Sequence, residues 1–408
     1  MPTIPPPSPF ARHFPLDPTI VFLNHGSFGS TPLAVLEAQN RHRALMESEP
    51  IRFFVELLSP MLDSVRTKLA AFLSCDAASI APVPNATIGV ATVFQNLKLQ
   101  PGDEILINDH EYPACCNNAR ALAARTGAQV ITAQLPFPVA SADDLYNAIM
   151  AKVTPRTKIA LISHVTSPSA LILPIERLVR DLSARNIETM VDGAHAPGFV
   201  HDLNLARMKP TYYTANCHKW ICSPKGSAFL YVDPAKRESF RPAILSNNAE
   251  SPREGRAQFL TEFDFVGTSD PSAFLSVSDA IDTMGQMLPG GWPAVIDHNQ
   301  KLVRQGRTIL CEKLGVTPPC PEDLLGCTAT IILPGPQPGS DRHTKLLSRK
   351  SVYHDALQDR LLSNWRIQVP IWNVAARCRT IRLSAQLYNS LDQYEYLAKA
   401  LTTELAAE

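Results

Sequence analysis

Residues 215–232 read ANCHKWICSPKGSAFLYV, and this segment decides the interpretation of the fold. A strand-like run ends just before Lys219, a turn containing Gly226 follows, and a second apolar run closes the segment. His218 and Trp220 flank the lysine and would shield its amine from water. A partly desolvated lysine can be neutral and attack an aldehyde. We therefore interpret Lys219 as a Schiff-base lysine, with an exposed surface lysine as the alternative.

Strand-like runs and helical patterns alternate on the N-terminal side of this segment. The expected strands are residues 80–83, 104–108, 129–133, 158–164, 188–192, 211–215 and 227–232, and the expected helices are residues 86–96, 114–126, 143–152 and 175–185. This alternation predicts an α/β fold with a mainly parallel sheet and helices on both faces. Such a sheet binds its ligand at the carboxyl ends of the strands.

The flanking regions differ from this alternation. Residues 32–72 show helical spacing, with breaks expected near Pro50 and Pro60. Beyond residue 265 the expected helices are 272–287, 292–314, 353–364 and 391–404, and the expected strands are 328–333, 367–369 and 380–384. We divide the chain into an N-terminal segment, a large domain and a smaller α+β domain at residues 1–30, 31–275 and 276–408. The Gly- and Pro-rich loop 335–341 is interpreted as a solvated connection, with an active-site flap as the alternative.

Composition narrows the class of partner. Lys and Arg together number 38, as do Asp and Glu, so the net charge is zero and no basic field exists for nucleic acid or an anionic membrane. The uncharged stretch at residues 159–175 is interrupted by polar residues and prolines, so it is not expected to span a membrane. The N-terminus does not resemble a signal peptide, and nine cysteines in no framework spacing suggest reduced thiols in the cytoplasm.

Residues 191–198, VDGAHAPG, place a carboxylate and an imidazole after an apolar strand. Asp192 could pair with the pyridinium nitrogen of pyridoxal phosphate and so make the ring an electron sink. His195 could reach the ring or its phenolic oxygen. Alone, the pair could be half a metal site or a helix cap. Asp192 precedes Lys219 by 27 residues, an order that fits a pyridoxal-phosphate enzyme.

Residues 83–90, VPNATIGV, lie at a strand-to-helix junction. The free N–H groups and the dipole at such a helix start attract anions, so Asn85, Ala86 and Thr87 could bind a phosphate. The same three residues match the N-glycosylation pattern, which a cytoplasmic location disfavours.

Seven segments in order along nearly the whole chain carry a family resemblance: LNHGSFGSTP, NDHEYPA, HVTSPSALILPI, VDGAHAPG, NCHKWICSPKGSAFLYV, FDFVGTSDPSAF and IRLSAQLYN. Together they resemble the isopenicillin N epimerase-like branch of the class V aminotransferase superfamily. The resemblance implies a fold-type I pyridoxal-phosphate enzyme with a mainly parallel seven-stranded sheet and a smaller C-terminal domain. It also implies an N-terminal segment bordering the active site, and a homodimer with shared active sites.

The resemblance implies roles for individual residues around the cofactor. Lys219 would form the internal aldimine, Asp192 would pair with the pyridinium, and His195 would contact the ring side. Further positions would hold the cofactor: Tyr112 stacked on the ring, Ser167 with Thr166 at the phenolic oxygen, and Ala86, Thr87 and His218 at the phosphate, with Asn85 beside them. Thr268 would reach the phosphate of the partner subunit.

The resemblance also implies a substrate pocket. Arg382 would bind the α-carboxylate of an amino-acid substrate in a bidentate pair, with Arg379 as a rival and a surface salt bridge as the alternative. Asn24 and His25 match a loop that borders this pocket. Arg52 could reach the same region or lie on a helix surface.

Cysteine desulfurases in the superfamily use a loop cysteine, and no cysteine here falls in a convincing catalytic segment. Cys320 and Cys327 flank a turn, and Cys115-Cys116 begins a helix. Cys217 and Cys222 bracket the lysine at a spacing that suits zinc poorly. Persulfide chemistry is therefore disfavoured.

The resulting hypothesis is an enzyme that acts at Cα of an L-amino acid through an external aldimine and a quinonoid. We rank β-elimination of a cysteine derivative, a C–S lyase reaction, first. Epimerisation and Mannich-type cyclisation in secondary metabolism are the alternatives, with transamination below them. A dehydrogenase would need a G-x-G-x-x-G turn that the chain lacks, and a non-enzymatic scaffold would be free to lose Lys219, Asp192 or Arg382.

Overall fold

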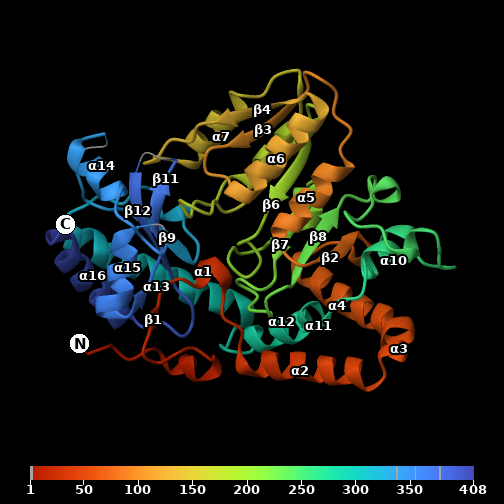
Figure 1. The fold of residues 1–408 in the computed structure, drawn as a ribbon, viewed down its shortest axis with the longest axis horizontal. Coiled ribbons are helices and arrows are strands. Elements are labelled where there is room, and N and C mark those ends of the chain that lie inside the picture. The colour runs from red at the N-terminus through yellow and green to blue at the C-terminus, as the bar shows by residue number, and fades with distance from the viewer. Residues whose placement is uncertain (1–2, 337–338, 354, 376–377) are drawn as a thin grey trace.

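A seven-stranded sheet forms the centre of the larger part of the molecule (Figure 1). The computed structural model describes residues 3–336, 339–353, 355–375 and 378–408. The sheet order is β2-β8-β7-β6-β5-β3-β4. β8 runs antiparallel to both of its neighbours, β2 and β7, and the pairs from β7 to β4 are all parallel. The strands are β2 (Ile80–Val83), β3 (Glu104–Asn108), β4 (Gln129–Ala133), β5 (Thr157–Ser163), β6 (Glu188–Asp192), β7 (Tyr212–Asn216) and β8 (Ala228–Val232). The predicted α/β fold with a mainly parallel sheet is confirmed.

Side chains alternate between the two faces of this sheet, because successive strand residues point to opposite sides. In β3, Ile105 and Ile107 pack into one buried cluster, whereas Leu106 packs into the other. The first cluster is covered by α5 (Ala86–Asn96), α6 (Pro113–Thr126) and α10 (Gln258–Asp264), and the second by α4 (Leu58–Leu73), α7 (Ala142–Met150), α8 (Ile175–Ser183) and α12 (Val277–Gly285). Burial of each Ile or Leu contributes about 1.5–3 kcal/mol, so both helix layers hold the strand ends in fixed positions.

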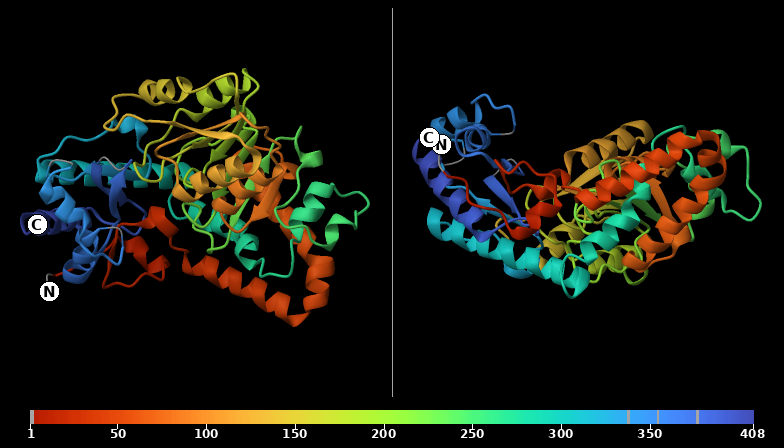
Figure 2. Two further views of the ribbon diagram at one scale, coloured as in Figure 1. Left: turned by 45° about the horizontal axis from the view of Figure 1, so that its top comes forward. Right: turned by 90° about the horizontal axis from the view of Figure 1, so that it is seen from below.

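A second, antiparallel sheet of order β11-β12-β9 lies in the C-terminal part of the chain. Its strands are β9 (Thr328–Ile332), β11 (Ile371–Val374) and β12 (Cys378–Ser384), and the helices of this part are α13 (Gly291–Leu314), α14 (Asp341–Leu347), α15 (Ala356–Trp365) and α16 (Leu391–Ala406). The short strand β1 (Val21–Phe22) pairs in parallel with β10 (Ile367–Gln368). Both termini therefore lie at the same end of the molecule (Figures 1 and 2).

The helices of the N-terminal region differ from expectation at one proline. The chain forms α2 (Leu33–Ser48), α3 (Pro50–Arg52), a π-helical turn (Phe53–Leu57) and then α4. Pro60 does not end the helical run: it lies in the first turn of α4, directly after the π-helical turn, in which the N–H of Leu58 bonds to the carbonyl oxygen of Phe53 instead of following the regular i→i−4 pattern. The expected helix 272–287 is divided into α11 (Ser272–Leu275) and α12.

The short elements α1 (His25–Phe28) and α9 (Leu205–Met208) complete the described helices of the α type. Of loop 335–341, residues 337 and 338 lie outside the described residues. Within the described ranges, no helix combines the length and the apolar character that crossing a membrane requires.

Candidate active site

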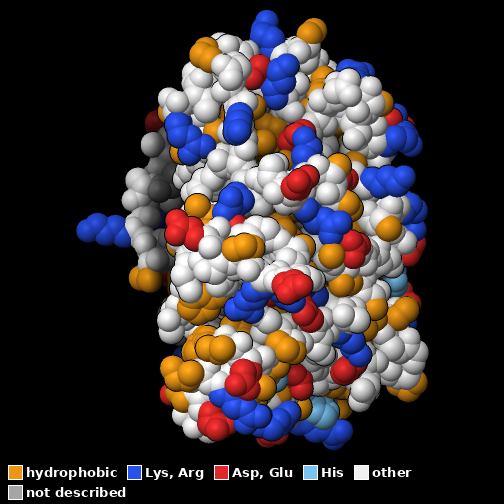
Figure 3. All heavy atoms as spheres, turned by 90° about the vertical axis from the view of Figure 1, so that its right-hand side faces the viewer, with side chains coloured by type: hydrophobic (Ala, Val, Ile, Leu, Met, Phe, Trp, Pro, Cys, Tyr) orange, Lys and Arg blue, Asp and Glu red, His pale blue; other side chains and the backbone are white. Residues whose placement is uncertain are grey.

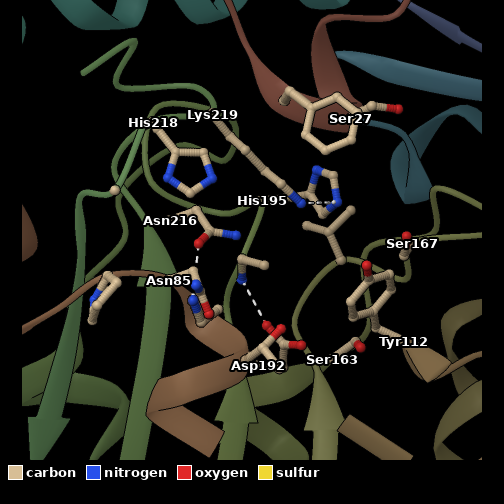
Figure 4. A pocket seen from close by; sticks show the side chains of 17 residues that line it. Ser27, Asn85, Tyr112, Ser163, Ser167, Asp192, His195, Asn216, His218 and Lys219 are labelled. Atoms are coloured by element: carbon tan, nitrogen blue, oxygen red, sulfur yellow. Dashed lines mark hydrogen bonds between the residues drawn. The ribbon is translucent and has the colours of Figure 1, made fainter. Parts of the chain in front are cut away.

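A pocket of about 360 Å³ opens at the carboxyl ends of the central strands (Figure 4). Most of the predicted cofactor residues line it, although they come from distant parts of the sequence. Its polar lining comes from Ser27, Asn85, Thr87, Tyr112, Ser163, Ser167, Asp192, His195, Asn216, His218 and Lys219. The alternation of strands and helices thus brings these motifs to one edge of the sheet, as the sequence predicted.

Lys219 follows β7, and its Nζ lies 3.0 Å from Nε2 of His195. Burial lowers the pKa of the lysine amine to about 8, and the positive charge of Arg382 acts in the same direction. A substantial fraction of the amine is therefore neutral near pH 8. The neutral amine is the form that attacks an aldehyde.

His195 receives a second contact at its other ring nitrogen. The indole N–H of Trp220 donates to Nδ1 of His195 at 3.4 Å. Burial holds the pKa of the imidazole well below its usual value, and Lys219 and Arg382 add to this effect. His195 is consequently neutral at physiological pH.

Asp192 ends β6 and lies buried on the floor of the pocket. The backbone N–H of Ala194 donates to Oδ1 at 2.9 Å, and the thiol of Cys115 donates to Oδ2 at 3.2 Å. Neither donor is a cation, and burial raises the pKa of the carboxyl. A protonated pyridine nitrogen would supply the missing positive partner.

A further buried carboxyl, that of Glu111, lies behind this floor. It accepts hydrogen bonds from the backbone N–H of Ser163 at 2.8 Å, from the Ser163 hydroxyl and from Asn108. Burial raises its pKa to about 8. Because Glu111 precedes Tyr112, these bonds anchor the segment that carries the ring lining the pocket.

The opposite end of the pocket lies at the start of α5. Asn85 caps this helix by accepting from the N–H of Ile88 at 2.9 Å, while Oδ1 of Asn216 accepts from the N–H of Ala86 at 2.9 Å. Within the described chain, the N–H and hydroxyl of Thr87 remain available to an anion. His218 lines the same end, and its Nδ1 lies 3.0 Å from the carbonyl oxygen of Ser227.

Arg382 does not line the pocket directly but lies immediately behind it. Its Nη1 donates to the carbonyl oxygen of Ser167 at 2.6 Å, and its Nη2 donates to the hydroxyl of Ser27 at 3.2 Å. Its guanidinium carbon also lies 4.6 Å from the ring centroid of Trp372. Nε is buried and has no hydrogen-bond partner among the described residues. A buried guanidinium with only neutral partners fits the carboxylate of an amino acid.

Arg379, the alternative candidate for binding the substrate carboxylate, forms ion pairs away from the pocket. Its guanidinium forms ion pairs with Asp355 and Glu408, at 2.6 Å each. Arg52 is exposed and pairs with Glu49 at 2.8 Å. Both arginines therefore have structural partners away from the pocket.

The N-terminal segment lies directly on the lysine loop. Gly29 has φ +72°, and a Cβ on it would lie 2.2 Å from the carbonyl oxygen of His218, so only glycine fits here. Ser27 and Phe28 line the pocket, whereas Asn24 and His25 lie behind it. Nε2 of His25 lies 2.9 Å from the carbonyl oxygen of Lys219. A substrate contact for Asn24 and His25 stays a prediction.

Two other predicted residues lie outside the lining. Thr166 is buried and bonds to Ser169 at 2.7 Å, and Thr268 is exposed. No cysteine is among the described residues that line the pocket. The sequence interpretation placed the loop at residues 24–30 beside the pocket without naming Ser27 or Phe28. It overlooked Ser163 and Asn216, although Asn216 carries the same signal as Asp192, a polar residue that ends an apolar strand.

These observations fit pyridoxal phosphate. An amine with a lowered pKa, a buried carboxyl without a cationic partner and a helix start with an available N–H match its aldehyde, its ring nitrogen and its phosphate. The fold and this donor set define a fold-type I pyridoxal-phosphate enzyme. The family model described as aminotransferase class-V matches residues 29–317, and the chain belongs to this family.

The chain is 32% identical over 402 residues to the isopenicillin N epimerase of Streptomyces clavuligerus, and the match covers 95% of each chain. It is 27% identical to the probable chloroplastic L-cysteine desulfhydrase of Arabidopsis thaliana, over 97% of this chain and 84% of that protein. The predicted resemblance to the isopenicillin N epimerase-like branch is thereby confirmed.

A solved structure supports the same fold. A lysine-to-alanine mutant of C-DES, with glycine covalently linked to its PLP cofactor, superposes with a TM-score of 0.76 at 20% identity. The match covers 97% of this chain and 99% of that chain. Family and fold together confirm pyridoxal phosphate as the cofactor.

Proposed function

We propose that this enzyme catalyses β-elimination of a cysteine derivative, a C–S lyase reaction. The observation that carries the proposal is the Lys219 amine, which shares a pocket with the buried carboxyl of Asp192. The guanidinium of Arg382 borders the same pocket through Ser27 and Ser167, and its Nε has no hydrogen-bond partner among the described residues. When bound, pyridoxal phosphate supplies an aldehyde that condenses with amines and a ring that accepts the electron pair from Cα.

The chain's own residues would then act on the substrate in a fixed order. Arg382 would bind the α-carboxylate, and its position behind Ser27 and Ser167 would orient Cα toward Lys219. The neutral amine of Lys219 would take the proton from Cα. The Cβ–S bond would break with its electron pair on sulfur, and 2-aminoacrylate would react with water to give pyruvate and ammonia.

Elimination is favoured over epimerisation by the placement of Lys219 and His195. Nζ of Lys219 and Nε2 of His195 lie 3.0 Å apart, so His195 lies beside the lysine rather than across a substrate from it. Elimination needs one base, whereas epimerisation needs a proton returned to the opposite face of Cα. The similarity to an isopenicillin N epimerase nevertheless makes epimerisation the second candidate.

The test is a visible spectrum of the purified protein, followed by a pyruvate assay with L-cysteine, cysteine conjugates and sulfoxides. We expect a yellow band, release of pyruvate, and loss of both in Lys219→Ala. Lys225→Ala, an exposed lysine on the same turn, is the matched control and should keep both. A yellow band without pyruvate, but with solvent deuterium entering Cα, would replace elimination with epimerisation or cyclisation.

We also propose a homodimer with shared active sites. Apolar side chains near the pocket are exposed in the single chain, including Phe28 at 72%, Tyr112 at 46% and Val266 at 38%. The loop that carries Thr268 borders a second pocket, which shares Pro84 and Gly226 with the first. The end of the molecule with α3, α4 and α10 mixes both signs of charge with hydrophobic side chains (Figure 3).

All nine cysteines are unpaired, which supports a cytoplasmic location.

A further inference from the structure

Trp220 follows Lys219 in the chain but contacts the other side of His195. Its side chain is 1% exposed and lies 4.7 Å from the His25 ring and 5.1 Å from the Phe199 ring, measured between centroids. Its indole N–H donates to Nδ1 of His195. An indole nitrogen is a donor only, so Nδ1 must present a lone pair rather than a proton.

This contact decides where the proton of His195 lies. A neutral imidazole carries one N–H, and with Nδ1 as acceptor that proton is on Nε2. Nε2 is the atom 3.0 Å from Nζ of Lys219. An Nε2–H must donate to a lone pair, which a neutral amine has and an ammonium lacks. Two donors would otherwise face one another.

We propose that Trp220 is a positioning residue that fixes His195 as the Nε2–H tautomer and thereby favours the neutral, nucleophilic form of the Lys219 amine over the ammonium form. This inference rests on the proposed use of Lys219 as the Schiff-base lysine. It assigns Trp220 to the chemistry of the site although the indole does not line the pocket.

The titratable groups around the pair come from several elements. Arg382 on β12 acts on the pKa of both groups. His25 in α1 and His218 act on that of His195, and Asp192 on β6 and Cys115 on α6 act on that of Lys219. Arg382 disfavours protonation of the amine, whereas Asp192 favours it. A Trp220→Phe variant leaves all of these groups in place and removes only the donor and part of the ring.

The experiment measures the reactivity of the Lys219 amine in the cofactor-free protein. Trace acetylation between pH 6 and 10 is followed by peptide mass spectrometry, with the exposed Lys301 as internal reference. We expect Trp220→Phe to lower the relative acetylation rate of Lys219 roughly 2–10-fold at pH 7, the effect of one hydrogen bond, and to move the pH midpoint upward. Trp292→Phe, which loses an indole bond to the carbonyl oxygen of Ile281, is the matched control and should leave the profile unchanged.

Two further measurements separate this role from a structural one. In a His195→Asn background, Trp220→Phe should have no additional effect on the acetylation of Lys219, because asparagine has no imidazole tautomer for the indole N–H to fix. In the unaltered protein, ¹⁵N shifts of labelled histidine should show Nε2 of His195 protonated and Nδ1 unprotonated. A protonated Nδ1, or an unchanged acetylation profile in Trp220→Phe, would overturn the proposal. Neither readout depends on turnover, so failure of the C–S lyase assay is a distinguishable result.

Discussion

The thiol of Cys115 donates to Oδ2 of Asp192 at 3.2 Å, beneath the floor of the pocket. Thiols are weak hydrogen-bond donors, so this bond does not balance the charge of the carboxylate as a cationic partner would. Asp192→Asn should lower turnover by roughly 10–150-fold, because a charge-assisted hydrogen bond to the cofactor ring would be lost. Cys115→Ala should lower it less than about tenfold. Steady-state kcat and the visible spectrum of each variant check this, and equal losses in the two variants would contradict it.

Arg382 is expected to act mainly on substrate binding. Arg382→Gln should raise KM for the amino acid, since loss of one partner of a buried charge pair costs about 2–5 kcal/mol. Arg379→Gln is the control: its ion pairs with Asp355 and Glu408 predict lower thermal stability with KM retained. Steady-state kinetics and thermal melts separate the two effects. A larger KM change in Arg379→Gln than in Arg382→Gln would show that Arg379 binds the substrate carboxylate.

Lys219 is expected to destabilise the cofactor-free protein below about pH 8. Its amine has a pKa of about 8 in the fold, against an ordinary lysine value of 10.5 in the unfolded chain. Between these values the unfolded chain binds more protons, so stability rises with pH there. The cost is therefore complete below about pH 8 and absent above about pH 10.5. Lys219→Met should melt a few degrees higher than the unaltered protein at pH 7, with the difference shrinking toward pH 10. The control Lys301→Met should show no such pH-dependent gain.

The alternation of strands and helices was sufficient to predict the sheet and the gathering of Asp192, Lys219 and His218 at one edge, because parallel strands present their carboxyl ends together. The motif LNHGSFG did not predict which side chains face the pocket. In a helix each residue turns by about 100°, so the orientation of the four-residue α1 depends on its packing. It directs Ser27 and Phe28 to the pocket and His25 to the backbone of Lys219. The indole bond of Trp220 likewise depends on packing that no local pattern encodes.

Gly29 should tolerate no side chain. Gly29→Ala adds a Cβ 2.2 Å from the carbonyl oxygen of His218 at φ +72°, so both strain and displacement of the lysine loop follow. We expect weaker retention of pyridoxal phosphate, measured as visible absorbance after dialysis. Gly102→Ala is the matched control: its φ is +89°, but nothing lies within 4 Å of the new Cβ. That variant should be destabilised only by about 1–3 kcal/mol of backbone strain and keep its cofactor. Equal cofactor loss in both variants would show that the close contact with the carbonyl oxygen of His218 is not the cause of that loss.

Shared active sites predict complementation between two inactive variants. Lys219→Ala lacks the Schiff-base amine, and Thr268→Glu would repel a phosphate in the partner subunit's pocket. Unfolding and refolding a mixture should form hybrid dimers in which one site combines an intact Lys219 with an intact Thr268. Random pairing would restore about a quarter of the sites. Pyruvate release and the yellow band should recover in the mixture and not in either variant refolded alone. If each pocket used only its own chain, Thr268→Glu would be active by itself or the mixture would stay inactive, and the shared-site arrangement would be excluded.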